Sequence, residues 1–157
     1  MPIQQEIKQT RPFSTRSEEA AVALMRTADI VRRAVGAVVE AEGITVQQYN
    51  VLRILRGAGE RGLPTLEIAE RMIEQTPGIT RLIDRLEGKQ LVQRVRCLTD
   101  RRQVFCRITE EGLTLLARLD APISAADAAA LESLGDHDLA QLIQLLDKTR
   151  NAYRRAS

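Results

Sequence analysis

The apolar pattern of residues 65–108 changes from helical to strand periodicity, and this change constrains the fold more than any other feature. Its first part, residues 65–88, predicts two helices joined by a short turn. We expect the second helix to start from Thr76 as its N-cap, with Pro77 at the first helical position, because the N–H of that position is left unpaired in any case. Apolar residues then recur at helical spacing as far as Leu86 and bury one face.

The second part of this segment predicts a β-hairpin. Residues 91–96 and 104–108 alternate between apolar and polar side chains, as strands with one buried face do. A turn centred on residues 101–102 would place Val95 opposite Ile108. The expected lobe is therefore a helix-turn-helix followed by a hairpin, which is the winged helix-turn-helix arrangement.

The length and composition favour a single domain made mostly of helices. The chain has 157 residues, which fits one domain of ordinary size. Apolar residues make up 44%, whereas aromatic residues make up only 3% and tryptophan is absent. A core of this composition is built from Leu, Ile, Val and Ala, which suits packed helices. The predicted fold class is mainly α with a small β-hairpin.

A long amphipathic helix is predicted near each end of the chain. Apolar residues recur at steps of three and four across residues 17–42, and again across residues 139–153. Such stripes can face the core of their own subunit, but long helices on both sides of a compact middle also favour an intertwined homodimer. The predicted organisation is a flexible N-terminal arm at residues 1–16, dimerisation helices at residues 17–45 and 110–157, and a winged helix-turn-helix lobe at residues 46–109.

Positive charge is concentrated in one segment of a chain whose formal net charge is only +2. Residues 76–107 carry eight basic and three acidic side chains, whereas residues 108–149 carry two basic and eight acidic ones. A basic segment can be an ordinary solvated surface, but one confined to a helix and the adjoining hairpin is typical of a surface that binds a polyanion. Double-stranded DNA is the expected partner.

The second helix of the pair has a surface suited to the DNA major groove, where each base pair presents a distinct pattern of donors and acceptors. Small polar residues at its start allow close approach, and the guanidinium of Arg81 can donate two hydrogen bonds to guanine. Arg85, one turn later, is placed either for a phosphate or for an ion pair with Asp84 or Glu87. The candidate DNA contacts in this segment are Gln75, Thr76, Gly78, Thr80, Arg81 and Arg85.

The tip of the predicted hairpin is the second candidate DNA contact. A loop that carries Arg101 and Arg102 can reach the adjacent minor groove, whose negative potential attracts arginine when the groove is narrow. Asp100 would hold one of these arginines extended through a charge-assisted hydrogen bond. A surface hairpin with a local salt bridge would contain the same residues, so both interpretations stay open on the tip alone.

Several motifs resemble those of the MarR family of bacterial transcriptional regulators, in the same order over about residues 20–150. The motifs are Val46-Gln47-Gln48-Tyr49-Asn50-Val51-Leu52, Leu66-Glu67-Ile68-Ala69-Glu70, Thr80-Arg81-Leu82-Ile83-Asp84-Arg85-Leu86, Leu91-Val92-Gln93-Arg94, Asp100-Arg101-Arg102 and Ile108-Thr109-Glu110-Glu111-Gly112. One position departs from the family pattern. Gln90 stands where members usually have glycine, so the exit from the recognition helix is expected to be shaped differently.

The resemblance implies a winged-helix homodimer joined by its terminal helices, with one recognition helix per subunit in successive major grooves. It implies that Thr76 to Arg81 contact bases, that Arg102 enters the minor groove and that Asp100 braces the hairpin. Many members respond to a small phenolic or other lipophilic effector bound between the dimer helices and the DNA-binding lobe. The resulting expectation is a ligand-responsive repressor that binds a pseudo-palindromic operator.

Two hypotheses concern regulation. Tyr49 and residues Val35 to Val39 either line an effector pocket or belong to the core. In the hairpin register given above, Cys97 and Cys106 lie opposite each other beside basic residues, which lower a thiol pKa and make the thiol reactive. A disulfide between them would distort the hairpin and act as a redox switch. Alternatively, Cys106 is an ordinary buried residue and Cys97 has no such role.

Other function classes find little support in the sequence. There is no glycine-rich phosphate loop or nucleophile signature, and His137, the single histidine, has no second imidazole with which to hold a metal. We therefore expect neither an enzyme nor a bound cofactor or metal.

Residues 20–25 form the longest apolar run, too short to cross a membrane, and no secretory signal is visible, so a cytoplasmic protein is expected. A winged helix that binds proteins instead of DNA is the alternative, although its exposed surface would more often be apolar.

Overall fold

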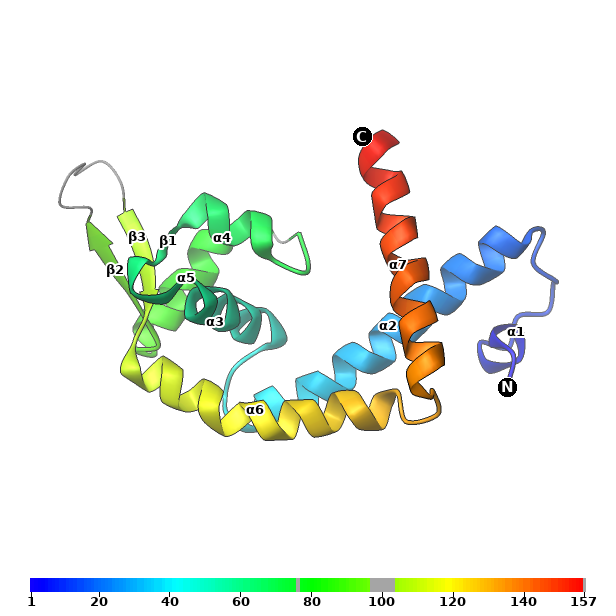
Figure 1. The fold of residues 1–157 in the computed structure, drawn as a ribbon, viewed down its shortest axis with the longest axis horizontal. Coiled ribbons are helices and arrows are strands. Elements are labelled where there is room, and N and C mark those ends of the chain that lie inside the picture. Colours follow the sequence, from blue (N-terminus) through cyan, green and yellow to red (C-terminus); the bar gives the residue numbers. More distant parts are fainter. Residues whose placement is uncertain (76, 97–103, 157) are drawn as a thin grey trace.

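Helices form most of the computed structural model, which describes residues 1–75, 77–96 and 104–156, the last four by their backbone alone (Figure 1). This confirms the predicted fold class, which is mainly α with a small β-hairpin. The elements in chain order are α1 (Ile3–Glu6), α2 (Arg16–Ala41), α3 (Val46–Ala58), the 3-10 helix η1 (Gly59–Arg61), β1 (Leu63–Pro64), α4 (Thr65–Arg71), α5 (Ile79–Gly88), β2 (Val92–Arg96), β3 (Val104–Ile108), α6 (Glu110–Ala130) and α7 (Asp136–Ala156).

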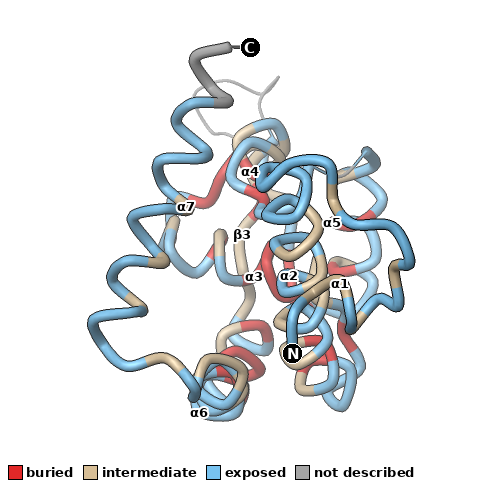
Figure 2. The backbone as a smooth tube through the Cα atoms, turned by 90° about the vertical axis from the view of Figure 1, so that its right-hand side faces the viewer, coloured by how far each residue is buried: buried red, intermediate tan, exposed pale blue. Residues whose placement is uncertain are grey.

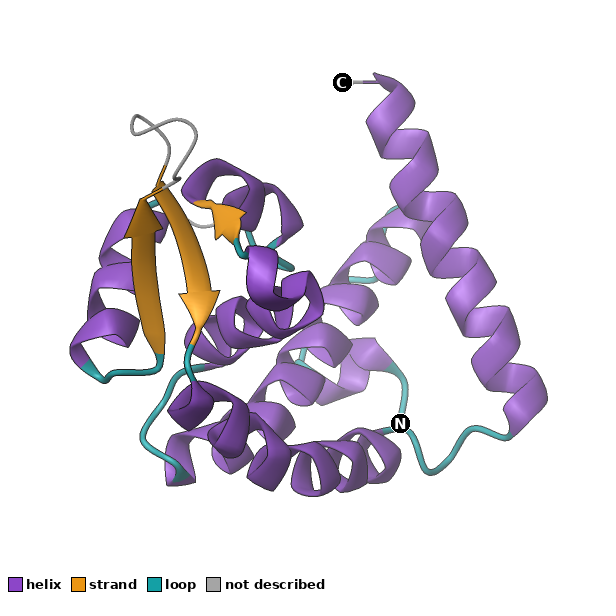
Figure 3. Ribbon diagram, turned by 60° about the vertical axis from the view of Figure 1, so that its left-hand side comes forward, coloured by secondary structure: helices purple, strands orange, loops and turns teal. Residues whose placement is uncertain are grey.

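The elements form a lobe and a set of long terminal helices (Figure 1). Helices α3, α4 and α5 pack together beside the sheet and make up the lobe. Helices α2 and α6 lie against each other beneath it, whereas α7 rises away from the lobe in both ribbon views (Figures 1 and 3). The chain therefore has the helix-turn-helix, hairpin and long terminal helices that the periodicity predicted.

The described strands form one antiparallel sheet in the order β1-β3-β2. The short extended piece that Pro64 imposes joins the sheet as β1, where Leu63 pairs with Cys106. Proline is tolerated there because β1 is an edge strand that does not need every N–H. The hairpin of β2 and β3 is thus anchored to the chain segment just before α4.

The register of the hairpin differs from the predicted one. Val95 pairs with Phe105, not with Ile108, which pairs instead with Val92. The physical reason lies at the base of the hairpin, where the N–H of Thr109 donates to the carbonyl of Leu91 at 3.1 Å. This contact closes the two strands at their base in the same register as the pair of Val92 with Ile108.

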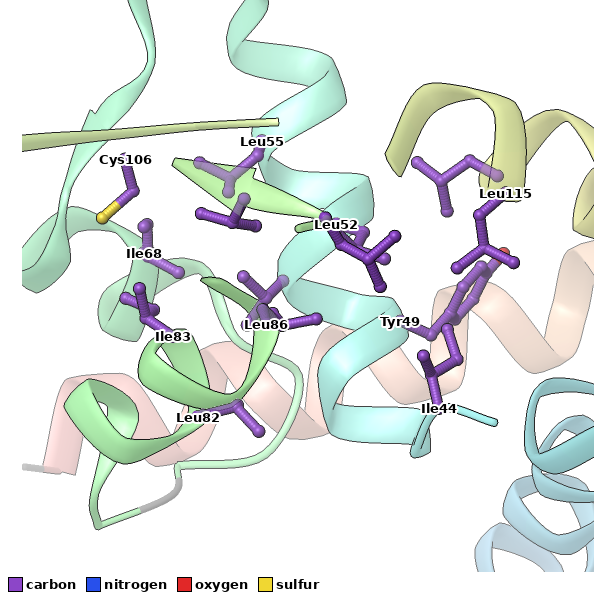
Figure 4. Packing of buried hydrophobic residues seen from close by; sticks show 14 of the residues in the cluster. Ile44, Tyr49, Leu52, Leu55, Ile68, Leu82, Ile83, Leu86, Cys106 and Leu115 are labelled. Carbon is purple, nitrogen blue, oxygen red and sulfur yellow. The ribbon is translucent and has the colours of Figure 1, made fainter. Parts of the chain in front are cut away.

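The core is a single cluster inside the lobe that continues along α6 (Figures 2 and 4). It is aliphatic, as the scarcity of aromatic residues predicted. Fully buried side chains come from α3, α4, α5, β2, β3 and α6, and they include Leu52, Leu55, Ile68, Ile83, Leu86, Val92, Cys106, Leu116 and Leu119. Burying one such side chain stabilises a fold by about 1.5–3 kcal/mol, so this cluster fixes α5 against α3 and the sheet.

Side-chain caps start α2 and α3, and α6 continues through a proline. Thr15 caps α2, and Thr45 forms a capping box with Gln48 at the start of α3. Helix α6 runs through Pro122 without a break, although proline cannot donate the hydrogen bond that a helix interior uses. Helix α6 packs along α2, and its buried residues include Leu119 and Ile123, one on each side of Pro122 in the sequence.

The N-terminal segment contains a short helix that polar composition did not predict. Helix α1 lies against α2, and the carboxylate of Glu6 accepts a hydrogen bond from Nε of Arg26 at 2.7 Å. Residues 1–16 therefore have local structure within the described chain. Their flexibility and the division into an arm, dimerisation helices and a lobe remain predictions.

Candidate nucleic-acid interface

Helix α5 presents one polar face and one buried face. Leu82, Ile83 and Leu86 are buried in the core (Figure 4). The opposite face is exposed and carries Thr80, Arg81, Asp84 and Arg85. An amphipathic helix of this kind is held rigidly by its apolar side while its polar side remains available to a ligand.

The start of α5 differs from the predicted start. Gly78 is the N-cap, with a left-handed φ of +97°, and the helix begins at Ile79. The predicted start from Thr76, with Pro77 in the first turn, is therefore wrong. The left-handed backbone conformation, which glycine adopts easily, interrupts the helical path there. Gln75 and Gly78 thus lie in the loop before α5, both exposed, and Thr76 lies outside the described residues.

Arg81 and Arg85 provide exposed positive charge one turn apart on α5. Neither forms an ion pair with any residue that the structure describes. For Arg85 the sequence allows either a phosphate contact or an ion pair with Asp84 or Glu87. Both carboxylates pair elsewhere, so the ion pair is not formed and the guanidinium remains available for an anion.

Asp84 and Glu87 bind Arg94 of β2, an arrangement that the sequence analysis missed. The guanidinium donates to Oδ1 of Asp84 and to Oε2 of Glu87, each at 2.5 Å. The two acidic residues stand three positions apart on a helix that turns directly into the strand carrying Arg94. That spacing was the available signal, because residues three apart on a helix share one side.

The tip of the hairpin lies outside the described residues. This applies to Cys97, Asp100, Arg101 and Arg102, so their predicted roles stay predictions. The strands that carry the tip are defined, and β2 packs against α5. The sheet therefore ties the base of the hairpin to the helix with the exposed arginines.

The position of Cys106 corrects the predicted cysteine pair. In the observed register Cys106 is opposite Arg94, so it is not opposite Cys97. Its side chain is fully buried, near Ile68 (Figure 4), and burial raises the pKa of the thiol above its ordinary value. The hydroxyl of Thr65 lies 4.0 Å from Sγ. Cys106 is therefore a buried apolar residue with a thiol that burial makes less reactive.

The residues considered for an effector pocket are part of the core. Tyr49 is 6% exposed, Val39 is fully buried, and burial raises the pKa of the tyrosine hydroxyl. Neither lines either of two hollows on the surface of the described chain. One hollow lies between the start of α6, the end of α5 and the α2–α3 turn, and the other between α1 and α2.

The described part of the chain lacks two other kinds of feature. It contains no group of three His, Cys, Asp or Glu side chains placed to hold a metal ion. None of its helices combines the length and the apolar character needed to span a bilayer.

The sequence matches a known family across the lobe. The model of the MarR family matches residues 44–104, from just before α3 to the start of β3. This segment contains α5 with its exposed arginines and also β2, whose Arg94 pairs with the two carboxylates of α5.

Solved structures extend this similarity over most of the chain. A MarR transcription factor from Planctomyces limnophilus is 37% identical, with 87% of this chain and 98% of that chain covered and a TM-score of 0.66. CouR from Rhodococcus jostii RHA1, solved with p-coumaroyl-CoA, is 28% identical over 87% of this chain and 95% of its own, with a TM-score of 0.73. MepR of S. aureus, solved as a DNA complex, shares the fold at 20% identity, with 84% and 96% coverage and a TM-score of 0.76.

Proposed function

The chain belongs to the MarR family of transcription regulators, and on this premise we propose that it binds specific double-stranded DNA sequences through α5. The observation that carries the proposal is the exposed face of α5, where Thr80, Arg81 and Arg85 stand on a helix fixed by its buried side. A helix of this size fits the major groove. MepR, which has the same fold, was solved with DNA.

The expected contacts divide into those that read bases and those that hold the backbone. Gln75, Gly78 and Thr80 lie at or before the start of α5, where side chains are small enough for close approach, and Thr76 is assigned to the same group. Arg81 would donate to guanine, a contact worth roughly 1–3 kcal/mol of discrimination. Arg85 would contact phosphate, which positions the protein but carries no sequence information.

The hairpin tip is the second part of the proposed interface. Arg101 and Arg102 would reach the minor groove beside the site of α5, and Asp100 would brace them. Support comes from the anchoring of β2 against α5, which limits how far the hairpin base can move from the helix. The assignment of these three residues rests on the family resemblance.

We further propose that the protein acts as a homodimer. Helix α7 has no buried residue among those whose side chains are described, and Ile143 and Leu145 on it are 59% and 62% exposed (Figure 2). On α2, Met25 is 65% exposed. Large exposed apolar side chains on these two terminal helices indicate a surface that another chain covers. A second copy would also present a second α5.

The expected regulatory mode is repression relieved by a small effector. CouR was solved with p-coumaroyl-CoA, which carries a phenolic ring, and a Bordetella bronchiseptica protein of the same fold, BpsR, is regulated by 6-hydroxynicotinic acid. For this chain we propose a small phenolic or lipophilic effector that binds between the terminal helices and the lobe. Such a ligand would act by changing the relative position of the two recognition helices.

Selection of bound duplexes from a random pool tests the proposed function. The expected product is a two-fold-related sequence with half-sites about one helical turn apart. Arg81→Ala should change the preferred bases, whereas Arg102→Ala should weaken binding to most sequences alike. Arg33→Ala on α2, which pairs with Asp29, removes the same charge far from α5 and should change neither. Recovery of no enriched sequence by the wild type would contradict sequence-specific binding.

A further inference from the structure

The amide side chain of Asn50 is unusual because it lies in a core made almost entirely of apolar side chains. Asn50 stands in the middle of α3 and is 8% exposed. Gln48 is the one other polar residue buried to this degree in the described chain, and the capping box at the start of α3 accounts for it. Burying an amide costs free energy unless a hydrogen bond compensates it. The partner of Asn50 therefore indicates why an amide stands at this position.

Asn50 binds the backbone of the segment that joins α4 to α5. Its Oδ1 accepts a hydrogen bond from the N–H of Ile73 at 2.9 Å. Helix α4 has ended by this point, because the backbone of Met72 is already extended. Gln47, three positions before Asn50 and on the same side of α3, donates from Nε2 to Oε2 of Glu74 at 3.3 Å. Two consecutive residues of the connecting segment are thus bound by two side chains of α3.

Residues 73–75, which we call the entry segment, are not held in place by burial. From residue 73 to residue 78, every residue that the structure describes is exposed, whereas Met72 is buried. Even the apolar side chain of Ile73 is 78% exposed. Apolar packing therefore ends at Met72 and cannot fix the backbone that follows. The hydrogen bond to Asn50 connects that backbone to the core.

The entry segment leads directly to the polar face of α5. Gln75 is its last residue, and Gly78 caps α5 three positions later. A glutamine amide can donate to and accept from adenine at the same time, so Gln75 has the chemistry to read that base in the major groove. Such a contact discriminates between bases only when the amide is held in place by surrounding structure. The bond between Asn50 and Ile73 fixes the main chain two residues before this side chain.

We propose that Asn50 is a positioning residue for base recognition, which contacts no DNA and instead holds the entry segment where Gln75 meets an adenine. This inference rests on the proposed function, because it assumes that the start of α5 enters the major groove. It also explains why α3 carries an amide at a core position that an aliphatic side chain could fill.

Asn50→Leu tests this role, because leucine has nearly the same shape as asparagine but no acceptor. The readout is a ratio of two affinities. One is for the selected duplex, and the other is for a duplex with G·C at the A·T pair for which Gln75→Ala loses its preference. We expect the ratio to fall by about tenfold in Asn50→Leu. The midpoint of urea unfolding should stay near that of the wild type, because leucine suits the core and water can reach the exposed entry segment.

Two more variants at position 50 separate the acceptor oxygen from the size of the side chain. Asn50→Asp keeps an oxygen that the N–H of Ile73 can reach, and although its charge weakens binding to both duplexes, it should keep the wild-type ratio. Asn50→Ala removes the oxygen together with the bulk and should lose the ratio as Asn50→Leu does. Val39→Ala, at a fully buried position of α2, is the control for lost stability and should keep the ratio.

A double-mutant cycle with Gln75→Ala shows whether Asn50 acts through the entry segment. If Asn50→Leu acts by displacing Gln75, it should change the ratio little once residue 75 is alanine, so the two effects are not additive. A merely structural role of Asn50 would instead lower the affinity for both duplexes alike and leave the ratio of the wild type unchanged.

The outcomes distinguish this inference from the proposed function. A wild-type ratio in Asn50→Leu or Asn50→Ala, a lost ratio in Asn50→Asp or Val39→Ala, or additive effects in the cycle would overturn the role of Asn50 and leave DNA binding intact. An unchanged base preference in Gln75→Ala would also overturn it, because the entry segment would then read no base. Failure of the wild type to bind any duplex would overturn the proposed function itself.

Discussion

At the scale of single residues, the exit from α5 depends on a backbone conformation that glycine adopts more easily. Gln90 has a left-handed φ of +60°, and its N–H and that of Leu91 close the end of the helix on the carbonyls of Glu87 and Leu86. The family pattern that the sequence resembles has glycine at this position. The turn in this chain is therefore formed in spite of its side chain, at a cost of roughly 1–2 kcal/mol for an L-residue.

Replacing Gln90 by glycine should stabilise the protein. Glycine removes the strain but adds freedom to the unfolded chain, so the expected net gain is roughly 0.5–1 kcal/mol in the free energy of unfolding. Urea denaturation at one fixed protein concentration measures it. Gln93→Gly, at an exposed strand position, should instead destabilise. Equal losses in both variants would show that position 90 is not strained.

The residue scale also shows what the sequence could not reveal about the interface. The exposed polar face of α5, including Arg81 and Arg85, was predicted correctly from helical spacing. The pairing of Asp84 and Glu87 with Arg94 was not, because it depends on how the strand leaves the helix and not on any single period. Periodicity identifies which side of a helix is exposed, whereas it does not identify the partner of an exposed charge.

At the scale of elements, the hairpin and the start of α6 pack so closely that position 112 has no room for a side chain. A Cβ on Gly112 would lie 2.5 Å from the carbonyl oxygen of Leu91 and 2.6 Å from Cγ1 of Ile108. The N–H of Gly112 donates to Thr109, the N-cap of α6, whose hydroxyl donates to the carbonyl of Gln90 at 2.7 Å. The helix can approach the strands this closely only because Gly112 has no side chain.

Gly112→Ala should therefore destabilise the protein although alanine favours helices. The clash involves backbone that cannot move away easily, and we expect a loss of about 2 kcal/mol in thermal or urea unfolding. Gly57→Ala in α3 is the matched control. A Cβ there has nothing within 4 Å, so alanine should stabilise the helix by about 0.5 kcal/mol. Stabilisation by both substitutions would contradict the close packing.

The elements themselves were largely predictable, but their ends and register were not. The spacing of apolar residues, about four in the helices and two in the strands, located the helices and both strands of the hairpin. The start of α5 was missed because Gly78 turns left-handed, and the hairpin register was missed because the contact of Thr109 with Leu91 fixes it. Both features depend on neighbouring elements, which a pattern within one segment does not contain.

At the scale of the whole molecule, the exposed apolar residues of α2 and α7 predict a homodimer. Ile143→Glu would place a charge where an apolar contact is expected and should convert the dimer to monomer in analytical ultracentrifugation. Gln144→Glu adds the same charge at the adjacent exposed position and should weaken association much less. A wild-type monomer at micromolar concentration, or a dimer unaffected by Ile143→Glu, would contradict this surface.

The most direct test of DNA recognition by α5 is methylation protection of guanine N7 by dimethyl sulfate on the selected duplex. N7 faces the major groove, so the wild type should protect guanines in two grooves about one helical turn apart. Arg81→Ala should restore their methylation even at concentrations that saturate the duplex. Guanines that remain fully reactive when the wild type is bound, or protection that Arg81→Ala leaves unchanged, would contradict the placement of α5 in the major groove.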